Sequence, residues 1–287
     1  MTAIFKRELS SYFKGFTGYV YIAFVLFFIG TYSATLNVRG TYPSFEYAIG
    51  NMSFIYIIVI PILTMRVFAD EKRQKTDQLL YALPVSMGQV VVGKMLAVAV
   101  VMVVPAIVSC IYPPILGKFG SVNYASAYGS IIAFFFMGVA LASIGVFLST
   151  LTDSQAMSAG MCFLVLLVNY FQTTLVGFLP TSALASFLAI TVVILILAVI
   201  VWYMTKNLLA AAIFAVVIGG ANFIYYSVRP VKYGGLFPDI IGKLSMFSRF
   251  DTFIESAFDL TAILYYLTVT ALFMFFTVQS LEKRRWS

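Results

Sequence analysis

The sequence predicts an all-α, polytopic integral membrane protein, and two features of its composition support this prediction. Of its 287 residues, 62% are hydrophobic and 10% are charged, against about 45–50% and about 25% in soluble globular domains. The mean hydropathy of +0.99 means that the chain has too little polar surface to cover a water-soluble particle. A bilayer therefore replaces water around most of its surface.

Apolar runs that approach or exceed the roughly 20 residues of a membrane-spanning helix recur along the chain. They cover residues 18–36, 49–66, 90–115, 127–151, 157–179, 183–204, 208–226 and 260–281. The three runs between residues 157 and 226 are separated only by residues 180–182 and 205–207. These breaks hold a proline and an isolated lysine, which are both unfavourable in hydrocarbon. We therefore expect about eight transmembrane helices.

The distribution of Lys and Arg predicts the orientation of these helices. If the N-terminus is cytoplasmic, most basic residues fall on the cytoplasmic side. This matches the excess of Lys and Arg that is usual in the cytoplasmic loops of multi-pass membrane proteins. An even number of spans then returns the C-terminus to the same side, with the basic sequence EKRRW at 282–286. We expect both termini in the cytoplasm.

A short segment between the second and third runs, residues 70–86, has the pattern of an amphipathic helix. Its less polar positions recur at the i, i+3, i+4, i+7 spacing of one helix face. They are Thr76, Leu79, Leu80 and Leu83, and Pro84 ends the helix. We expect this helix on the cytoplasmic side, because it lies between two spans that meet there.

Residues 229–259 form a second amphipathic segment. Isoleucine, leucine and phenylalanine recur there with an approximately helical rhythm among Lys243, Arg249, Asp251 and Glu255. The pattern predicts amphipathic helices lying along the outer membrane interface.

The residues needed for common enzymatic chemistry are missing from the chain. It contains no histidine, which removes the commonest general base and metal ligand. The sequence GQVVVGKM at 88–95 matches the start of a phosphate-binding loop, but Met95 replaces the Ser or Thr that binds magnesium. We therefore expect a non-catalytic chain that binds no cofactor and does not hydrolyse ATP itself.

Several polar and small residues interrupt the apolar spans. Asn169, Gln172 and Thr173 lie in the fifth run, and two interpretations remain open for them: hydrogen bonds between helices, or the lining of a substrate path. On the fourth run, the small residues at 138, 142 and 145 predict a face on which other helices pack closely.

Three segments together resemble the membrane subunit of an ABC transporter of the ABC-2 type, of the gliding-motility and nitrous-oxide-reductase-maturation kind. The first is FKRELSSYFK at 5–14, followed by GYV at 18–20. The second runs from PILTMR at 61–66 through DEKR at 70–73, TDQLL at 76–80 and LPVS at 83–86 to Gly93 and Lys94. The third combines SRFDTF at 248–253 with LEKRRW at 281–286. Lys75 stands where the resembling permeases usually have glycine.

The resemblance implies an ATP-driven permease, an exporter, in the cytoplasmic membrane of a bacterium. It implies that residues 71–83 are the coupling helix that docks on a cytoplasmic ATP-binding subunit, and that residues 1–17 contain an N-terminal interface helix beside it. The coupling residues would be Glu71, Arg73, Thr76, Leu79, Leu80, Leu83 and Pro84, and those of the interface helix Lys6, Arg7 and Glu8.

The resemblance also implies partners and an internal insertion. ATP and magnesium would be bound by the partner subunit, and a second permease copy or a homologous permease would complete the translocation path as a dimer. Such permeases usually have six spans, so residues 183–226 would be an inserted pair of helices.

Two other functions remain compatible with the residues. The chain could be an ATP-independent carrier or channel, which would transport on its own. It could also be a membrane scaffold that moves nothing, in which case the activity of a partner ATPase would not depend on any substrate.

Overall fold

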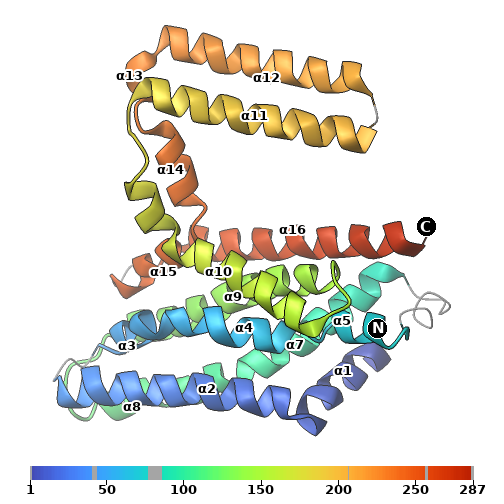
Figure 1. Ribbon diagram of the computed structural model, residues 1–287. Coiled ribbons are helices and arrows are strands. Elements are labelled where there is room, and N and C mark those ends of the chain that lie inside the picture. The colour runs from blue at the N-terminus through green and yellow to red at the C-terminus, as the bar shows by residue number, and fades with distance from the viewer. Residues whose placement is uncertain (1, 41–43, 77–85, 206, 256–257, 286–287) are drawn as a thin grey trace. The chain divides into compact units, whose positions relative to one another are not determined.

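The computed structural model describes residues 2–40, 44–76, 86–205, 207–255 and 258–285. Every regular element in these ranges is a helix, which confirms the all-α prediction (Figure 1). The chain divides into two compact units, which are described separately below. Unit 1 comprises residues 1–170 and 246–287, and unit 2 comprises residues 171–245.

The first half of the chain forms helices up to α9. They are α1 (Thr2–Lys14), α2 (Phe16–Tyr32) with its π-helical extension η1 (Ser33–Arg39), α3 (Phe45–Met52), the 3₁₀ turn η2 (Ser53–Ile55), α4 (Tyr56–Thr64), α5 (Ala69–Arg73), α7 (Met87–Ser109), α8 (Tyr112–Leu116) and α9 (Tyr124–Ser149).

The second half contains α10 (Gln155–Gly177), α11 (Ala183–Thr205), α12 (Leu208–Val228), α13 (Pro230–Tyr233), α14 (Leu236–Lys243), α15 (Met246–Ile254) and α16 (Leu260–Arg285).

Six helical segments of the described chain are long and apolar enough to cross a membrane. They cover Phe16–Arg39, Phe45–Arg73, Met87–Leu116, Tyr124–Ser149, Gln155–Gly177 and Leu260–Lys283. A seventh is counted if α12 and the helices after it, which are bent by 118° at residue 229, form one broken span. The multi-pass prediction is therefore confirmed, with six to seven candidate spans in place of the expected eight.

Helix α9 is the centre of unit 1, where it packs against α3, α4, α7, α15 and α16. Its small residues make this possible. A Cβ atom added at Gly138 would lie 2.6 Å from the hydroxyl of Tyr56, and one at Gly145 would lie 2.2 Å from Oγ1 of Thr64. The expected close-packing face of the fourth run is confirmed, and it receives α4 and α7.

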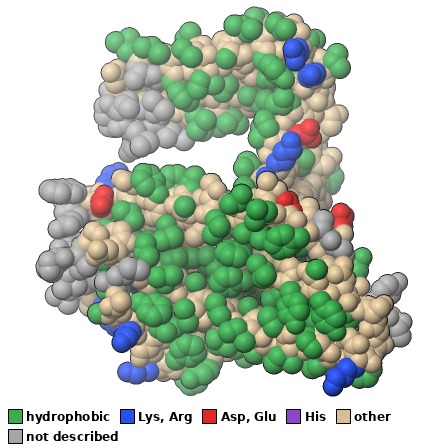
Figure 2. Space-filling view, turned by 180° about the vertical axis from the view of Figure 1, so that it is seen from behind, with side chains coloured by type: hydrophobic (Ala, Val, Ile, Leu, Met, Phe, Trp, Pro, Cys, Tyr) green, Lys and Arg blue, Asp and Glu red, His purple; other side chains and the backbone are tan. Residues whose placement is uncertain are grey.

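The periphery of unit 1 is apolar, as a bilayer requires. Hydrophobic side chains cover most of the face seen in Figure 2, and Lys and Arg lie toward its edges. Many of these side chains are exposed, for example Phe27 at 67% and Ile107 at 63%. This surface suits contact with lipid.

The apolar face of helix α15 packs on protein, whereas its pattern predicted contact with the outer membrane interface. Its apolar face is buried in the core of unit 1, where Phe250 and Phe253 are 1% and 2% exposed. It packs on α3, α9 and α16. Periodicity reveals an apolar face but not what covers it, and here protein covers it in place of lipid.

Unit 2 is built around the paired helices α11 and α12 (Figure 1). The amide of Asn222 in α12 donates to Oγ1 of Thr191 in α11 at 3.0 Å, and its carbonyl oxygen accepts from the hydroxyl of Tyr233. Phe187 stacks on Tyr226 with ring centroids 4.7 Å apart. These contacts hold the predicted inserted pair together as a helical hairpin.

Candidate functional site: the α5 hub

Helix α5 is a single short helix that carries the sequence ADEKR and forms the end of the second candidate span. Consecutive residues of an α-helix point about 100° apart, so Asp70, Glu71 and Lys72 face three different directions. Each meets a different part of unit 1. We call these three residues and the side chains that they contact the α5 hub.

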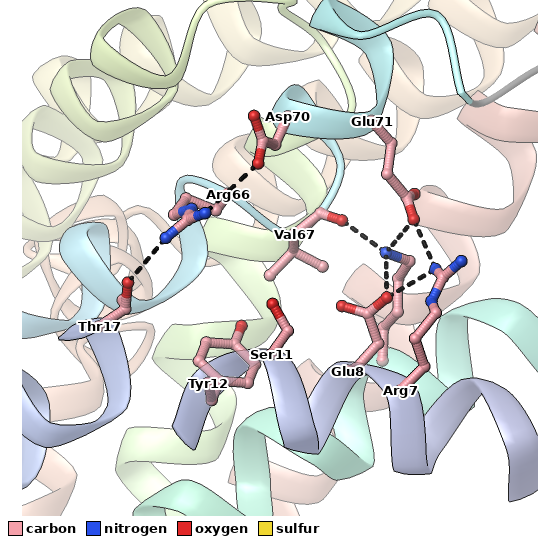
Figure 3. Close-up of a pocket in the computed structure, with 10 residues that line it drawn as sticks. Arg7, Glu8, Ser11, Tyr12, Thr17, Arg66, Val67, Asp70 and Glu71 are labelled. Carbon is pink, nitrogen blue, oxygen red and sulfur yellow. Dashed lines mark hydrogen bonds and ion pairs between the residues drawn. The ribbon is translucent and has the colours of Figure 1, made fainter. Parts of the chain in front are cut away.

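Glu71 connects α5 to α1 and α7. Its Oε1 atom lies 3.0 Å from Nζ of Lys94 and 2.7 Å from Nη2 of Arg7. Arg7 also pairs with the neighbouring Glu8 at 2.7 Å, and Glu8 lies 3.2 Å from Lys94. Figure 3 shows Arg7 and Glu8 pointing from α1 toward Glu71.

Lys94 is the most buried charge of this cluster, with a side chain that is 1% exposed. Its ammonium group also donates to the backbone carbonyl of Val67 at 2.8 Å. A lysine has three donors, and here they face three acceptors on α1, on α5 and on the turn after α4. Since burying an unpaired ammonium is very unfavourable, these partners are what allows Lys94 to be buried.

The charges of this cluster cancel: Arg7 and Lys94 are positive, Glu8 and Glu71 negative. Burial alone would lower the pKa of the Arg7 guanidinium, but hydrogen bonds and attraction from Glu8 and Glu71 raise it above its ordinary value. A cavity of about 220 Å³ lies beside the four side chains. The arrangement is a compact, neutral ion-pair cluster that ties three segments together.

Asp70 forms the second connection of the hub. Its carboxylate accepts a hydrogen bond from the side-chain amide of Gln155, at the start of α10, at 2.7 Å. It also pairs with Arg66 at 3.5 Å, and Arg66 donates to Thr17 of α2 at 3.2 Å. Asp70 thereby links α5 to α10 and, through Arg66, to α2.

Lys72 forms the third connection and is buried. Its ammonium group donates to the backbone carbonyl of Thr150, directly after the end of α9. A cation is favourable there because the C-terminal end of a helix carries partial negative charge. The hydroxyl of Thr150 in turn contacts that of Ser280 in α16 at 3.0 Å.

The hub brings some of the predicted site residues together. Arg7 of the expected interface helix contacts Glu71 of the expected coupling segment, and Glu8 is linked to Glu71 through Arg7 and Lys94. Lys6, Arg73 and Thr76 are exposed to the surroundings. The remaining coupling residues, Leu79, Leu80, Leu83 and Pro84, lie outside the described residues.

The predicted helix over residues 70–86 is interrupted. It begins near the expected position, at Ala69, but α5 ends at Arg73. Lys75 then adopts a left-handed conformation with φ of 56°, which no α-helix can contain. The amphipathic pattern was wrong in including residues 74–76 in one continuous helix.

The polar residues of the fifth run lie in the second half of α10. The side-chain oxygen of Asn169 accepts a hydrogen bond from the backbone amide of Met246 at 3.3 Å, within unit 1. Gln172 donates to the carbonyl of Ile241, within unit 2. Thr173 is exposed. The first two contacts match the hydrogen-bonding interpretation, and a role in a substrate path stays a prediction.

Sequence reasoning missed Lys94 as a member of the site. The sequence placed it in a segment that matches the start of a phosphate-binding loop, but residues 88–94 lie inside α7, which Ser86 caps by accepting from the amide of Gln89 at 3.4 Å. A charge within an apolar run demands buried partners, and this signal could have identified it. Among the described residues, no group of three metal-ligating side chains could hold a metal ion.

The six candidate spans, the central α9 and the charged hub at one end of unit 1 define a polytopic membrane protein of the transporter class. The family model described as "ABC-2 family transporter protein" matches residues 16–276. The chain therefore belongs to the ABC-2 transporter family, and it is a multi-pass permease component of an ABC transporter. No curated protein and no solved structure matches it.

Proposed function

We propose that this chain is the permease of an ATP-driven exporter, and that the segment beginning with α5 receives the motion of a separate cytoplasmic ATP-binding subunit. Membership of the ABC-2 family implies such a partner. The chain itself would bind no nucleotide. ATP and magnesium would be held by the partner, and a second permease, identical or homologous, would complete the path.

The α5 hub is the observation that carries this proposal. One helix of five residues is tied to α1 and α7 through Glu71, to α10 through Asp70, and to the end of α9 through Lys72. A displacement of α5 would therefore act on most helices of unit 1 at once. This is what a helix that receives force from outside the membrane needs.

The same end of unit 1 would face the cytoplasm. Helix α1 contacts α5 through Arg7, and Ser280 of α16 contacts Thr150, to which Lys72 of α5 donates, so both terminal helices reach the hub (Figure 1). We place this end, with both termini, on the cytoplasmic side of a bacterial cell membrane. The many basic residues near it support that orientation.

Purification of the tagged chain from membranes tests the proposal. We expect a P-loop ATPase to co-purify and to hydrolyse Mg-ATP. Replacing both Leu79 and Leu80 by aspartate should reduce the recovered ATPase by about tenfold or more, because an apolar contact with the partner would be lost. Phe119→Asp, at a side chain that is 84% exposed, is the control and should leave recovery unchanged.

Two outcomes would contradict the proposal. Transport by the purified chain without any ATPase would identify a carrier or channel. Unchanged ATPase recovery and activity in the Leu79→Asp/Leu80→Asp variant would mean that this segment does not couple the permease to the ATPase, and would favour a scaffold.

A further inference from the structure

We propose that Lys94 is a positioning residue for coupling: it makes α1, α5 and α7 move as one body when the segment after α5 is displaced. This inference rests on the proposed function and assigns a role within it. The site is the four-residue cluster of Lys94, Glu71, Glu8 and Arg7.

The geometry assigns this role to Lys94 and to none of the exposed lysines. Its ammonium group is 1% exposed and contacts Glu71 on α5 at 3.0 Å, Glu8 on α1 at 3.2 Å and the carbonyl of Val67 at 2.8 Å. All three donors are thereby used. The ammonium group also lies 4.9 Å from the ring centroid of Phe68, which closes one side of the site.

The stiffness of the connection follows from burial. A solvent-exposed ion pair is weak and exchanges with water, whereas an ion pair held away from water is separated only at a high cost. If α5 moved away from α7, the ion pair between Glu71 and Lys94 would be broken while Lys94 stayed buried. Displacement of α5 therefore carries α7 along, and Glu8 carries α1.

Arg7 cannot replace Lys94 in this connection. It pairs with the same two carboxylates, but it lies on α1 and its side chain is 56% exposed. It joins α1 to α5, and its ion pairs within the described part of the chain are with Glu8 and Glu71. Lys94 is the member of this cluster that lies on α7, the third candidate span, which gives a prediction that separates coupling from stability.

The charge balance of the cluster provides the decisive variants. Lys94→Met alone leaves two carboxylates and one cation, so the protein should become less stable. Adding Glu71→Gln restores neutrality, because Arg7 and Glu8 remain as a pair. The double variant should regain stability but still lack the connection between α5 and α7.

The test uses the complete complex with its ATPase, reconstituted in lipid nanodiscs. Thermal unfolding reports stability, and the stimulation of ATP hydrolysis by the permease reports coupling. We expect Lys94→Met/Glu71→Gln to unfold near the temperature of the wild type while its stimulation falls about tenfold, the effect of losing one charge-assisted contact. The control Lys118→Met, at an exposed lysine, should change neither.

The conservative variant Lys94→Arg keeps a cation facing Glu71 and Glu8, so it keeps the connection between α5 and α7 and should retain most of the stimulation. It also decides the matter if the neutral double variant does not fold. The inference is overturned if the neutral double variant stimulates ATP hydrolysis as the wild type does, or if folded Lys94→Arg loses the stimulation. A wild-type complex without permease-dependent stimulation would instead contradict the proposed function.

Discussion

Lys75 illustrates how one residue can decide where a helix ends. Its φ of 56° lies in the left-handed region, which is unfavourable for residues with a Cβ atom and open to glycine. The resembling permeases usually have glycine at this position. Lys75 lies between α5 and residues 77–85, over which the sequence predicts the rest of the coupling helix.

Replacement of Lys75 by glycine should therefore stabilise the protein. We expect a gain in the free energy of unfolding of about 1 kcal/mol from relief of the left-handed strain, measured by thermal unfolding in detergent. Lys75→Ala is the matched control, because it removes the same charge but keeps the Cβ atom. Equal stabilisation by both variants would attribute the effect to the charge and contradict this explanation.

The members of the α5 hub show what could be predicted residue by residue. Arg7, Glu8 and Glu71 were singled out by the family resemblance, because they lie in two of the segments that carry it. Their mutual contacts could not, since residues 8, 71 and 94 meet only through the packing of α1, α5 and α7. A local pattern carries no information on such distant partners.

The helices themselves were largely predictable. Each of the six observed candidate spans overlaps one of the predicted apolar runs, because about 20 consecutive apolar residues have few alternatives to a spanning helix. The sequence could not predict what the apolar face of α15 packs against, since an apolar face can pack on protein as well as on lipid. Its burial by α3 and α9 depends on the fold of unit 1 as a whole.

The order of the spans limits how α11 and α12 can cross the membrane. In unit 1, the second candidate span ends at the hub with α5. Helix α9 also ends there, next to Thr150, and α10 starts there. Helix α10 therefore leaves the hub end, and α16 returns to it at Ser280. If both helices cross the membrane, we expect the residues between them to start and finish on the side away from the hub and to cross the membrane twice or not at all.

Two crossings fit the lengths of these helices. α11 has 23 residues and α12 has 21, which correspond to about 35 Å and about 32 Å of helix at 1.5 Å per residue. Both lengths match a hydrocarbon core of about 30 Å. Asn207, between them, is then expected on the same side as the N-terminus.

Labelling of a single cysteine placed at residue 207 tests this expectation. In a background without Cys110 and Cys162, Asn207→Cys should react with a membrane-impermeant maleimide only after the cells are opened. Lys118→Cys, in the predicted external loop after α8, is the control that should react in intact cells. Reaction of residue 207 in intact cells would mean that the hairpin does not cross the membrane.

At the scale of the whole molecule, the apolar helix bundle of unit 1 is joined to a charged hub at one end. The bundle suits the bilayer, and α9 holds its helices together through small residues. The hub joins α5 to α1, α7, α9 and α10, so an input at one short helix reaches the bundle. The family match covers both the bundle and the hub from residue 16 onward.

Photocrosslinking from residue 80 in intact membranes tests the central claim most directly. A photoreactive phenylalanine analogue at Leu80 should form a covalent adduct with the ATP-binding subunit, identified by its mass. The same analogue at Leu264, an exposed position on α16 within a candidate span, should form no such adduct. An adduct with the ATPase from residue 264, or none from residue 80 in a complex that hydrolyses ATP, would contradict the account.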